Sequence, residues 1–141
     1  MASQHLSIRL PQETIDRLDR LSNQSDGTRS ETARTFIEEG LRMMDHPGIV
    51  FRPGPTGRRA GLARGPDVWE IVSAIHVLTG HVDDPVAVLA DQIRLSAYEI
   101  QLALTYYEAF TDEVDQRIAL NHAALAGLEA AWMREQRFIQ Q

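Results

Sequence analysis

The sequence contains no cysteine and no lysine, and both absences limit the chemistry of the chain. Without cysteine it forms no disulfide and no thiolate metal site, which is consistent with a cytoplasmic protein. All 14 basic side chains are arginine. The sequence also lacks a signal-peptide pattern and an apolar run of about twenty residues, so we expect neither export by that route nor a membrane span.

Motifs of catalysis and of metal binding are also missing. The sequence has no nucleophile elbow, no phosphate loop and no metal-ligand spacing, and its five histidines are scattered. His76 and His81 are five residues apart across the expected end of a helix, which is not the one-turn spacing of a metal pair. The sequence therefore predicts a protein that is not an enzyme and uses no metal or other cofactor.

The formal charge of −6 is unevenly distributed along the chain. Residues 1–66 hold ten arginines against eight acidic residues, a net charge of +2, whereas residues 67–141 hold four arginines against twelve acidic residues, a net charge of −8. Because like charges repel, the acidic second half is a poor surface for DNA phosphates. The distribution favours DNA contact near the N-terminus and protein contact near the C-terminus.

The first ten residues show a strict alternation of polar and apolar side chains. Leu6, Ile8 and Leu10 alternate with His5, Ser7 and Arg9. This period of two is typical of a β-strand with one face buried and one face free, and the Pro that follows ends the strand. Taken alone, the strand also fits an ordinary sheet with one solvated face. The helices that follow it favour a more specific arrangement.

Two helical patterns follow this strand. Apolar residues recur every three positions from Ile15 to Leu21, and a polar turn then leads to a second helix that runs to about Met44. Thr28 and Glu31 have the spacing of a capping box at its start. A unit of about forty residues with one strand is too small to fold alone and leaves both strand edges unpaired. We therefore expect two copies to associate, with their strands paired antiparallel and their helices covering the apolar face.

The order of strand, proline, helix, turn and capped helix, with the residues HLSIRLP…GTRSETA, resembles the ribbon-helix-helix family of DNA-binding proteins over residues 4–45. The resemblance implies a homodimer whose two-stranded ribbon enters the major groove, and therefore a transcription regulator, expected to be a repressor, associated with the bacterial nucleoid in the cytoplasm. The residues that would contact bases are His5, Ser7 and Arg9. Those that would contact phosphates at the second helix are Thr28, Arg29 and Ser30. The expected dimer core is Leu6, Ile8, Leu10, Phe36, Ile37 and Leu41.

The chemistry of these side chains agrees with the roles that the resemblance implies. Arg9 has the strongest base-reading chemistry, because a guanidinium can donate to both acceptors of guanine, which is worth about 1–3 kcal/mol of discrimination. Ser7 can donate or accept at several bases, and His5 departs from the Arg or Lys often found at its position. The start of a helix favours an anion because its amides are free and its dipole is positive there.

Residues 46–66 form a break in composition, with five glycines and four prolines. This density excludes a helix and predicts two short extended pieces, Ile49–Phe51 and Arg59–Leu62, that can pair as a hairpin around Gly54–Gly57. The segment is rich in arginine: Arg52, Arg58, Arg59 and Arg64. It fits equally an arm that contacts DNA phosphates or a narrow minor groove, and a solvated linker between two domains.

Three helices are expected next, beginning after Asp67, Asp84 and Ser96, each in a capping position. The stretch LADQIRLSAYEIQLALTYY resembles a helix-turn-helix, with Arg94 in place of the glycine common at its tight turn. The exposed face of its second helix has no basic residue, which favours a packed trihelical unit over a second DNA reader. Residues 46–120 also resemble small domains of VapB-type antitoxins, which are paired with ribonuclease toxins. The alternative function is therefore an antitoxin that represses its own operon and neutralises a toxin through its C-terminal half.

The last helix is expected to run from Thr111 to about Phe138. Its apolar residues fall at steps of three and four, with Asn121 and Glu135 between them: Ile118, Leu125, Leu128, Trp132 and Ile139. The pattern fits a helix packed on its own domain and also a helix that docks on a second protomer or in the groove of a partner. In the second case Trp132 is the expected anchor.

Together these expectations describe a mainly α-helical protein with a short N-terminal β-strand, in which a ribbon-helix-helix dimer precedes a trihelical, helix-turn-helix-like domain and a long C-terminal helix. The expected domains are a DNA-binding and dimerisation domain at 1–45, a linker or hairpin at 46–66 and an acidic helical domain at 67–141. The expected partners are double-stranded DNA and a second copy, with higher oligomers on DNA, and a toxin protein under the alternative function. No membrane partner is expected.

Overall fold

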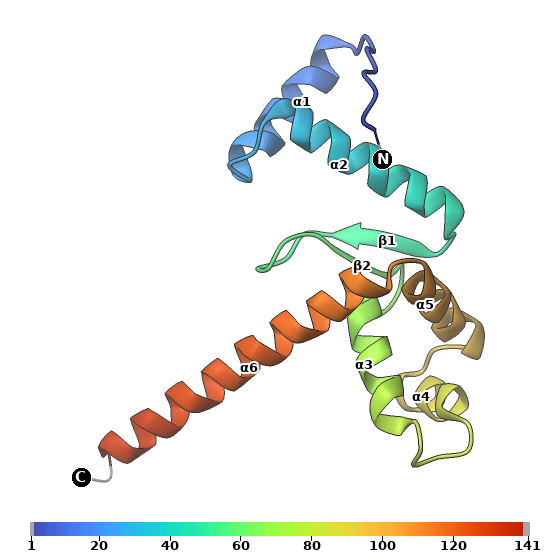
Figure 1. Cartoon of the computed structure of the whole chain (residues 1–141), viewed down its shortest axis with the longest axis vertical. Coiled ribbons are helices and arrows are strands. Elements are labelled where there is room, and N and C mark those ends of the chain that lie inside the picture. The colour runs from blue at the N-terminus through green and yellow to red at the C-terminus, as the bar shows by residue number, and fades with distance from the viewer. Residues whose placement is uncertain (1, 140–141) are drawn as a thin grey trace. The chain divides into compact units, whose positions relative to one another are not determined.

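The computed structural model describes residues 2–139, and the chain forms two compact units, Met1–Met44 and Asp45–Gln141. Over the described residues the chain is mainly helical, with six α-helices and one antiparallel sheet of two strands (Figure 1). The mainly helical class is thus confirmed.

The first unit contains two helices, α1 (Gln12–Gln24) and α2 (Arg29–Asp45). Pro11 precedes α1, and its carbonyl accepts the first helical hydrogen bond from the amide of Ile15 at 3.1 Å. The capping box of α2 is confirmed: the Glu31 amide donates to Thr28 Oγ1 at 3.1 Å, and the Thr28 amide donates to Glu31 Oε2 at 2.9 Å. Each bond satisfies an amide that the helix itself leaves without a partner.

The β-strand expected at the N-terminus is not present in the single chain. Residues 2–10 belong to no helix or strand, and Leu6 and Ile8 are 72% and 58% exposed. The expectation of a strand was therefore wrong for one chain by itself. The physical reason is that a strand is held by hydrogen bonds to a neighbouring strand, and the described part of this chain offers none to residues 2–10.

The sheet of the structure lies instead in the Gly- and Pro-rich segment, where a hairpin was one of two expectations. Strands β1 (Ile49–Arg52) and β2 (Arg59–Leu62) pair antiparallel, with Ile49 opposite Leu62 and Phe51 opposite Ala60. Ile49 and Leu62 are almost completely buried. The segment is therefore part of the hydrophobic core of the second unit.

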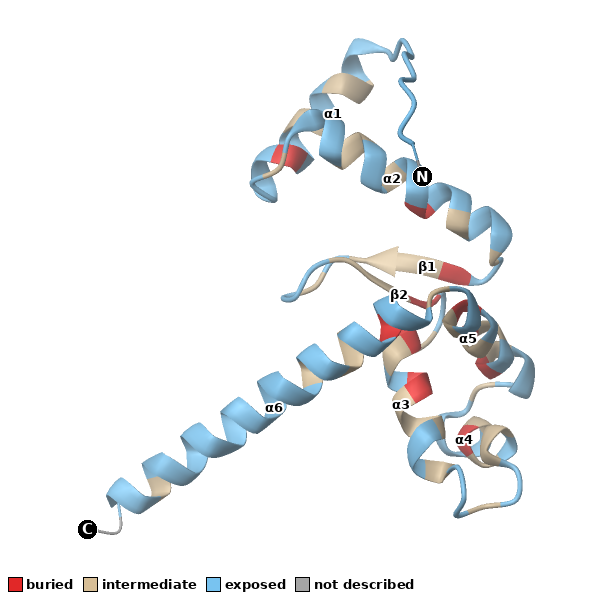
Figure 2. Ribbon diagram, in the orientation of Figure 1, coloured by how far each residue is buried: buried red, intermediate tan, exposed pale blue. Residues whose placement is uncertain are grey.

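Helices α3 (Val68–Leu78), α4 (Pro85–Ile93) and α5 (Ala97–Ala109) form the trihelical part of the second unit. The helices α3 and α5 are central, because both pack against β2, α4 and α6, and α5 also packs against β1. The core that they share consists of Ile49, Leu62, Val68, Ile71, Val72, Leu89, Ile100, Ala103, Tyr106 and Val114 (Figure 2). The capping boxes at Asp67 and Ser96 are present as expected.

Arg94 lies at the tight turn after α4, at the position where the resemblance to a helix-turn-helix would place a glycine. Its φ of 56° and ψ of 41° place it in the left-handed region. The turn therefore has the backbone geometry that glycine adopts most easily, although the residue is arginine.

The last helix, α6 (Thr111–Ile139), has 29 residues and is about 43 Å long at 1.5 Å per residue. Only its first turns pack on the other elements of the second unit, where Val114 is buried and Ile118 is half-buried. The remainder extends away from α3, α4 and α5, and most of its side chains are exposed (Figures 1 and 2). Packing on its own domain, one of the two expectations for this helix, is thus limited to its beginning.

No helix among residues 2–139 is both long enough and apolar enough to cross a membrane.

Candidate nucleic-acid interface

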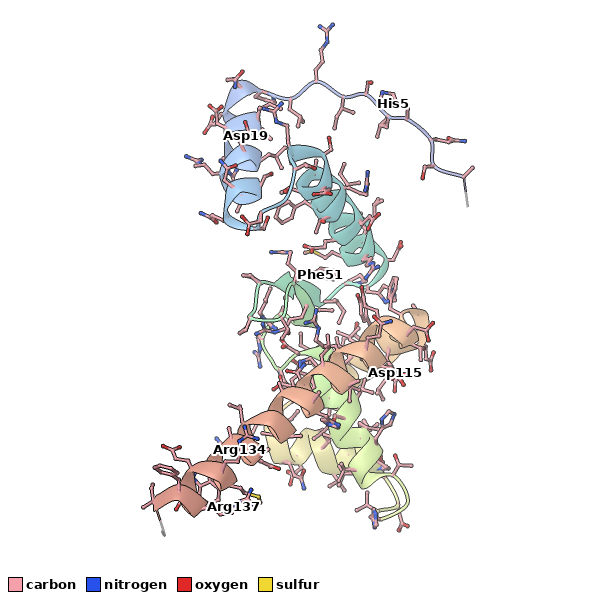
Figure 3. The ribbon with its side chains drawn as sticks, turned by 60° about the vertical axis from the view of Figure 1, so that its left-hand side comes forward. His5, Asp19, Phe51, Asp115, Arg134 and Arg137 are labelled. Atoms are coloured by element: carbon pink, nitrogen blue, oxygen red, sulfur yellow. The ribbon has the colours of Figure 1, made fainter. Side chains whose placement is uncertain are left out.

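The three residues expected to contact bases lie in the extended N-terminal segment. His5, Ser7 and Arg9 are all exposed, and Figure 3 shows His5 on this segment. His5 Nε2 and Ser7 Oγ share a hydrogen bond of 2.9 Å. Side chains two residues apart lie on one side of an extended chain, so this contact is the one that an alternating segment makes. His5 and Ser7 therefore lie on one side of the extended segment.

The apolar side chains of the first unit do not form a buried core. Among residues 2–44 no apolar side chain is buried; only Ser22 and Glu39 are. Of the residues expected in a dimer core, five are exposed by 37 to 72%: Leu6, Ile8, Leu10, Ile37 and Leu41. Phe36 is half-buried, in a hollow of about 230 Å³ that it lines together with Leu18 and Leu21. The unit thus presents an apolar surface with space to receive further side chains.

Polar contacts hold α1 and α2 together in place of a core. The Ser22 hydroxyl lies 2.7 Å from the carbonyl of Leu18 and 2.8 Å from Thr32 Oγ1 in α2. Arg29 donates to Asp19 through Nε at 2.8 Å and through Nη2 at 2.9 Å. The hydrogen bond from Arg29 lowers the pKa of Asp19, with a smaller opposing effect of desolvation, and the same bond raises the pKa of Arg29.

The residues expected to contact phosphate, Thr28, Arg29 and Ser30, are all exposed at the start of α2. The Thr28 hydroxyl is already used in the capping box, and Arg29 is paired with Asp19. Because both side chains of this ion pair are exposed, 55% for Arg29 and 41% for Asp19, solvent weakens their attraction and a phosphate can compete for the guanidinium. Arg29 is thus accessible to an external anion, in competition with a carboxylate of its own chain.

The arginine-rich hairpin separates into two groups. Arg52 and Arg59 both pair with Asp67, Arg52 Nη1 with Oδ1 at 2.9 Å and Arg59 Nε with Oδ2. Arg52 also donates to the carbonyls of Leu62 and Gly65. Asp67 is 7% exposed, so these bonds lie in a partly desolvated place and fix the hairpin to the start of α3. These bonds tie Arg52 and Arg59 to the fold of the second unit.

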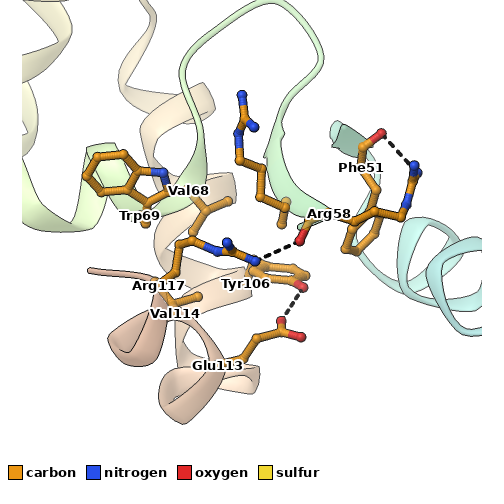
Figure 4. A pocket seen from close by; sticks show the side chains of 10 residues that line it. Phe51, Arg58, Val68, Trp69, Tyr106, Glu113, Val114 and Arg117 are labelled. Carbon is orange, nitrogen blue, oxygen red and sulfur yellow. Dashed lines mark hydrogen bonds between the residues drawn. The ribbon is translucent and has the colours of Figure 1, made fainter. Parts of the chain in front are cut away.

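Arg58 and Arg64 differ from this pair. Arg58 reaches the carbonyl of Phe51 at 3.5 Å, and its own carbonyl accepts from Arg117 of α6 at 2.9 Å (Figure 4). Arg64 is exposed in the loop after β2. Of the four arginines expected in an arm, Arg64 is therefore the one that is exposed and has no hydrogen bond or ion pair with the described residues of the chain.

A small hollow lies where the hairpin meets α5 and α6. Its volume is about 50 Å³, enough for roughly one or two water molecules. Tyr106 is fully buried at its wall and donates to Glu113 at 3.0 Å, while Arg117 crosses it to Thr56 and Arg58 (Figure 4). These bonds connect the hairpin, α5 and α6 around the hollow.

Sequence reasoning missed several of these residues. Asp67 was recognised as a helix cap, but not as the acceptor for two arginines, and the buried Tyr106 and the bridging Arg117 were not singled out. Tyr106 has a local signal, because it continues the three-residue spacing of Ile100 and Ala103. Asp67 and Arg117 have no such signal, since their partners lie far away in the sequence.

Trp132, the expected anchor for a partner, is 60% exposed on α6. This position leaves its ring available for a contact with another molecule. No metal cluster of three or more histidine and acidic side chains occurs in the described part of the chain.

No family model matches this chain, and no curated protein or solved structure is significantly similar to it.

Proposed function

We propose that the protein is a sequence-specific DNA-binding regulator that acts as a homodimer, with residues 5–10 of two copies paired as a ribbon in the major groove. The observation that carries the proposal is the incomplete first unit. Its alternating segment is extended and without a strand partner in the described chain, and its apolar side chains are exposed beside an open apolar hollow. A second copy would supply both the missing strand and the missing core.

The magnitude of the apolar surface supports association. Complete burial of one leucine or isoleucine side chain is worth about 1.5–3 kcal/mol, and each protomer exposes six such side chains in this unit, five of them by more than 40%. Because each is already partly buried, the twelve side chains of a dimer would gain about half of this value each, roughly 9–18 kcal/mol, which is comparable to the roughly 4–15 kcal/mol that association costs in lost freedom. Paired strands would add hydrogen bonds along residues 5–10.

The polar face of the same segment supplies the chemistry for DNA. In a strand that turns Leu6, Ile8 and Leu10 inward, His5, Ser7 and Arg9 point outward together. A two-stranded β-ribbon fits the major groove, where the pattern of donors and acceptors differs for every base pair. Arg9 would then select guanine, and the arginine-bearing start of α2 would hold the phosphate backbone.

The two units differ in net charge. Residues 1–44 hold six arginines against seven acidic residues, a net charge of −1, whereas residues 45–141 hold eight arginines against thirteen acidic residues, a net charge of −5. Phosphates therefore repel the second unit more strongly, and we expect the arginines of the first unit to make the DNA contact.

The test is a binding-site selection on random duplex DNA with the full chain, followed by affinity measurements on the selected site. The Arg9→Ala variant should lose preference at the guanine positions of the site by about 1–3 kcal/mol while its molar mass stays that of a dimer. Arg20→Ala, which removes the same charge from an exposed position of α1, is the matched control and should keep the preference.

Association is tested separately by the Ile8→Asp variant. Ile8 is 58% exposed in one chain, so a single folded chain tolerates aspartate there, whereas a shared core does not. We expect loss of specific DNA binding with the helix content of the chain retained. A wild-type chain that selects no sequence, or an Ile8→Asp chain that binds the selected site as well as the wild type, would contradict the proposal.

A further inference from the structure

The exposed part of α6 has an apolar stripe that the rest of the second unit does not cover. Beyond Ile118 the described side chains of this helix are exposed, apart from Asn121 and Gln136, which are half-buried. The large apolar side chains of the stripe are exposed by 57 to 69%: Leu125, Leu128, Trp132 and Ile139. Exposure of so long an apolar stripe to water is unfavourable, so we expect another molecule to cover it.

The spacing of the stripe is that of a helix pair. Positions 118, 121, 125, 128, 132, 135 and 139 alternate steps of three and four, which is the repeat that keeps one face of a helix directed at a neighbouring helix. Small side chains flank the stripe, with Ala124 on one side and Ala131 one heptad further along. Such residues allow two helix backbones to approach closely.

The charges of α6 differ between its two ends. Its first turns carry Asp112, Glu113 and Asp115 with Arg117, a net charge of −2 over residues 111–118, and its last turns carry Arg134 and Arg137 with Glu135, a net charge of +1 over residues 132–139 (Figure 3). Asp115 and both arginines are exposed. The helix is therefore complementary to a copy of itself that runs in the opposite direction, whereas a copy in the same direction would place like charges together.

We propose that the covering partner is α6 of a second copy of this chain, paired antiparallel with Leu125 facing Leu128 of the second copy. This register overlaps residues 119–134, the part of the helix beyond its own domain. It places Asn121 opposite Trp132 of the second copy, where the indole N–H meets an amide oxygen. It also places His122 opposite Glu129 of the second copy, and Ala124 opposite Ala131 of the second copy.

The antiparallel arrangement also keeps the acidic parts of the two copies apart. Residues 67–141 carry a net charge of −8, and most of the acidic residues precede the overlapping segment. Antiparallel pairing puts these regions at opposite ends of the helix pair, and it brings Arg137 within about one turn of Asp115 of the second copy. Parallel pairing would bring the two acidic regions side by side and stack Glu135 on Glu135 of the second copy.

This pairing does not rest on the proposed function, because it uses none of the residues assigned to DNA or to the first unit. If both interfaces form, one chain has two separate surfaces for self-association. Two dimers held on neighbouring DNA sites by their first units would then be joined through α6.

The test uses distances between spin labels on the full chain, which has no native cysteine to interfere. A label at Ala126→Cys lies near the centre of the proposed overlap, so two labels are offset along the helix by only about 2 Å. A label at Gln136→Cys is offset from its counterpart by about 28 Å at 1.5 Å per residue. We expect a short distance for the first label and a distance longer by about 10–20 Å for the second.

Aspartate variants test whether the short distance depends on the proposed contact between the two α6 helices. Leu125→Asp combined with Leu128→Asp should abolish the short distance at position 126. Leu120→Asp is the matched control, because Leu120 is 53% exposed on another face of the same helix, and it should retain the distance. Ile8→Asp, which tests the first unit, should retain it as well, so that failure of one proposal is distinguishable from failure of the other.

Three outcomes would overturn the inference. Equal short distances at both labels would mean parallel pairing. A distance at position 126 that survives the double aspartate variant would place the contact elsewhere. The absence of any interaction between labels at a protein concentration of about 100 μM would leave the stripe for a different protein, such as a toxin, and would exclude self-pairing of a strength typical of specific complexes.

Discussion

The guanidinium of Arg29 at the start of α2 meets the carboxylate of Asp19 in α1 at two points, with Nε–Oδ1 and Nη2–Oδ2 distances of 2.8 and 2.9 Å. Two parallel bonds are the strongest geometry for this pair of groups. The same arginine is the one that our proposal directs toward DNA phosphate. Under this proposal Asp19 would compete with DNA phosphate for the guanidinium of Arg29.

Replacement of Asp19 by Asn should strengthen DNA binding, because it releases Arg29 and removes one negative charge near the phosphates. We expect an affinity gain of about three- to tenfold at low salt and a slope of log K against log salt that is steeper by up to about one unit. Fluorescence anisotropy with labelled duplex measures both. Asp16→Asn removes the same charge from α1 without releasing Arg29, and an equal gain in that variant would contradict the competition.

The ion pair also predicts the titration of Asp19. Its pKa should lie below the ordinary value of 3.8, because the hydrogen bond from Arg29 favours the charged carboxylate, and Arg29→Ala should return it to that value. The stability that comes from a lowered pKa is present above the unfolded value and is lost as the pH falls through the folded one. Carboxyl ¹³C shifts measured from pH 2 to 6 give the pKa directly. An unchanged value in Arg29→Ala would show that the pair does not persist in solution.

Local signals in the sequence predicted much of the fold. The helix starts at Thr28, Asp67 and Ser96 were found because a capping box is completed within four residues. The two strands of the hairpin were found because glycine and proline limit the backbone wherever they occur. In each case the bonds that fix the structure connect neighbours in the chain.

Features that depend on distant partners were not predicted. The pairing of Asp67 with Arg52 and Arg59 spans 15 and 8 residues, and nothing in the spacing distinguishes these arginines from Arg64. The prediction of an N-terminal strand was wrong for one chain by itself for a related reason. Alternation shows that Leu6 and Ile8 can share a face, but the strand itself requires a second strand that one chain does not supply.

Asp67 should be important for stability, because it is the shared acceptor of two arginines and a cap of α3. Asp67→Asn keeps the shape but removes the charge that both guanidinium groups face. We expect a loss of about 2–4 kcal/mol in the free energy of unfolding, less than for a fully buried pair because the arginine side chains are 31% and 27% exposed. Urea denaturation measures the loss. Asp91→Asn, at an exposed position of α4, is the control and should change stability by less than about 0.5 kcal/mol.

The phenol of Tyr107 should titrate above its ordinary value of 10.0. It donates to Asp115 at 2.7 Å, and this bond raises its pKa, with smaller contributions from burial and from the negative charge of Asp115. The neutral phenol is the form that the fold favours, so the associated stability is present below pH 10 and is lost as the pH rises through the folded pKa. In Asp115→Asn the pKa should fall toward 10.0. Titration of ¹³C-labelled tyrosine rings by NMR distinguishes Tyr107 from the other two tyrosines.

Gly48, just before β1, should not tolerate a side chain. Its φ of 99° lies in the left-handed region, and a Cβ at this position would come within 2.6 Å of Cδ1 of Leu102 in α5. Strain and overlap together should make Gly48→Ala less stable by about 2–4 kcal/mol in urea denaturation. Gly80→Ala separates the two causes, because its φ of 86° is similar but no atom lies within 4 Å of its Cβ. That variant should lose only about 1–2 kcal/mol, since the backbone strain is then the single cost. Equal losses in the two variants would mean that Leu102 moves aside and that the close packing of β1 on α5 contributes nothing to the difference.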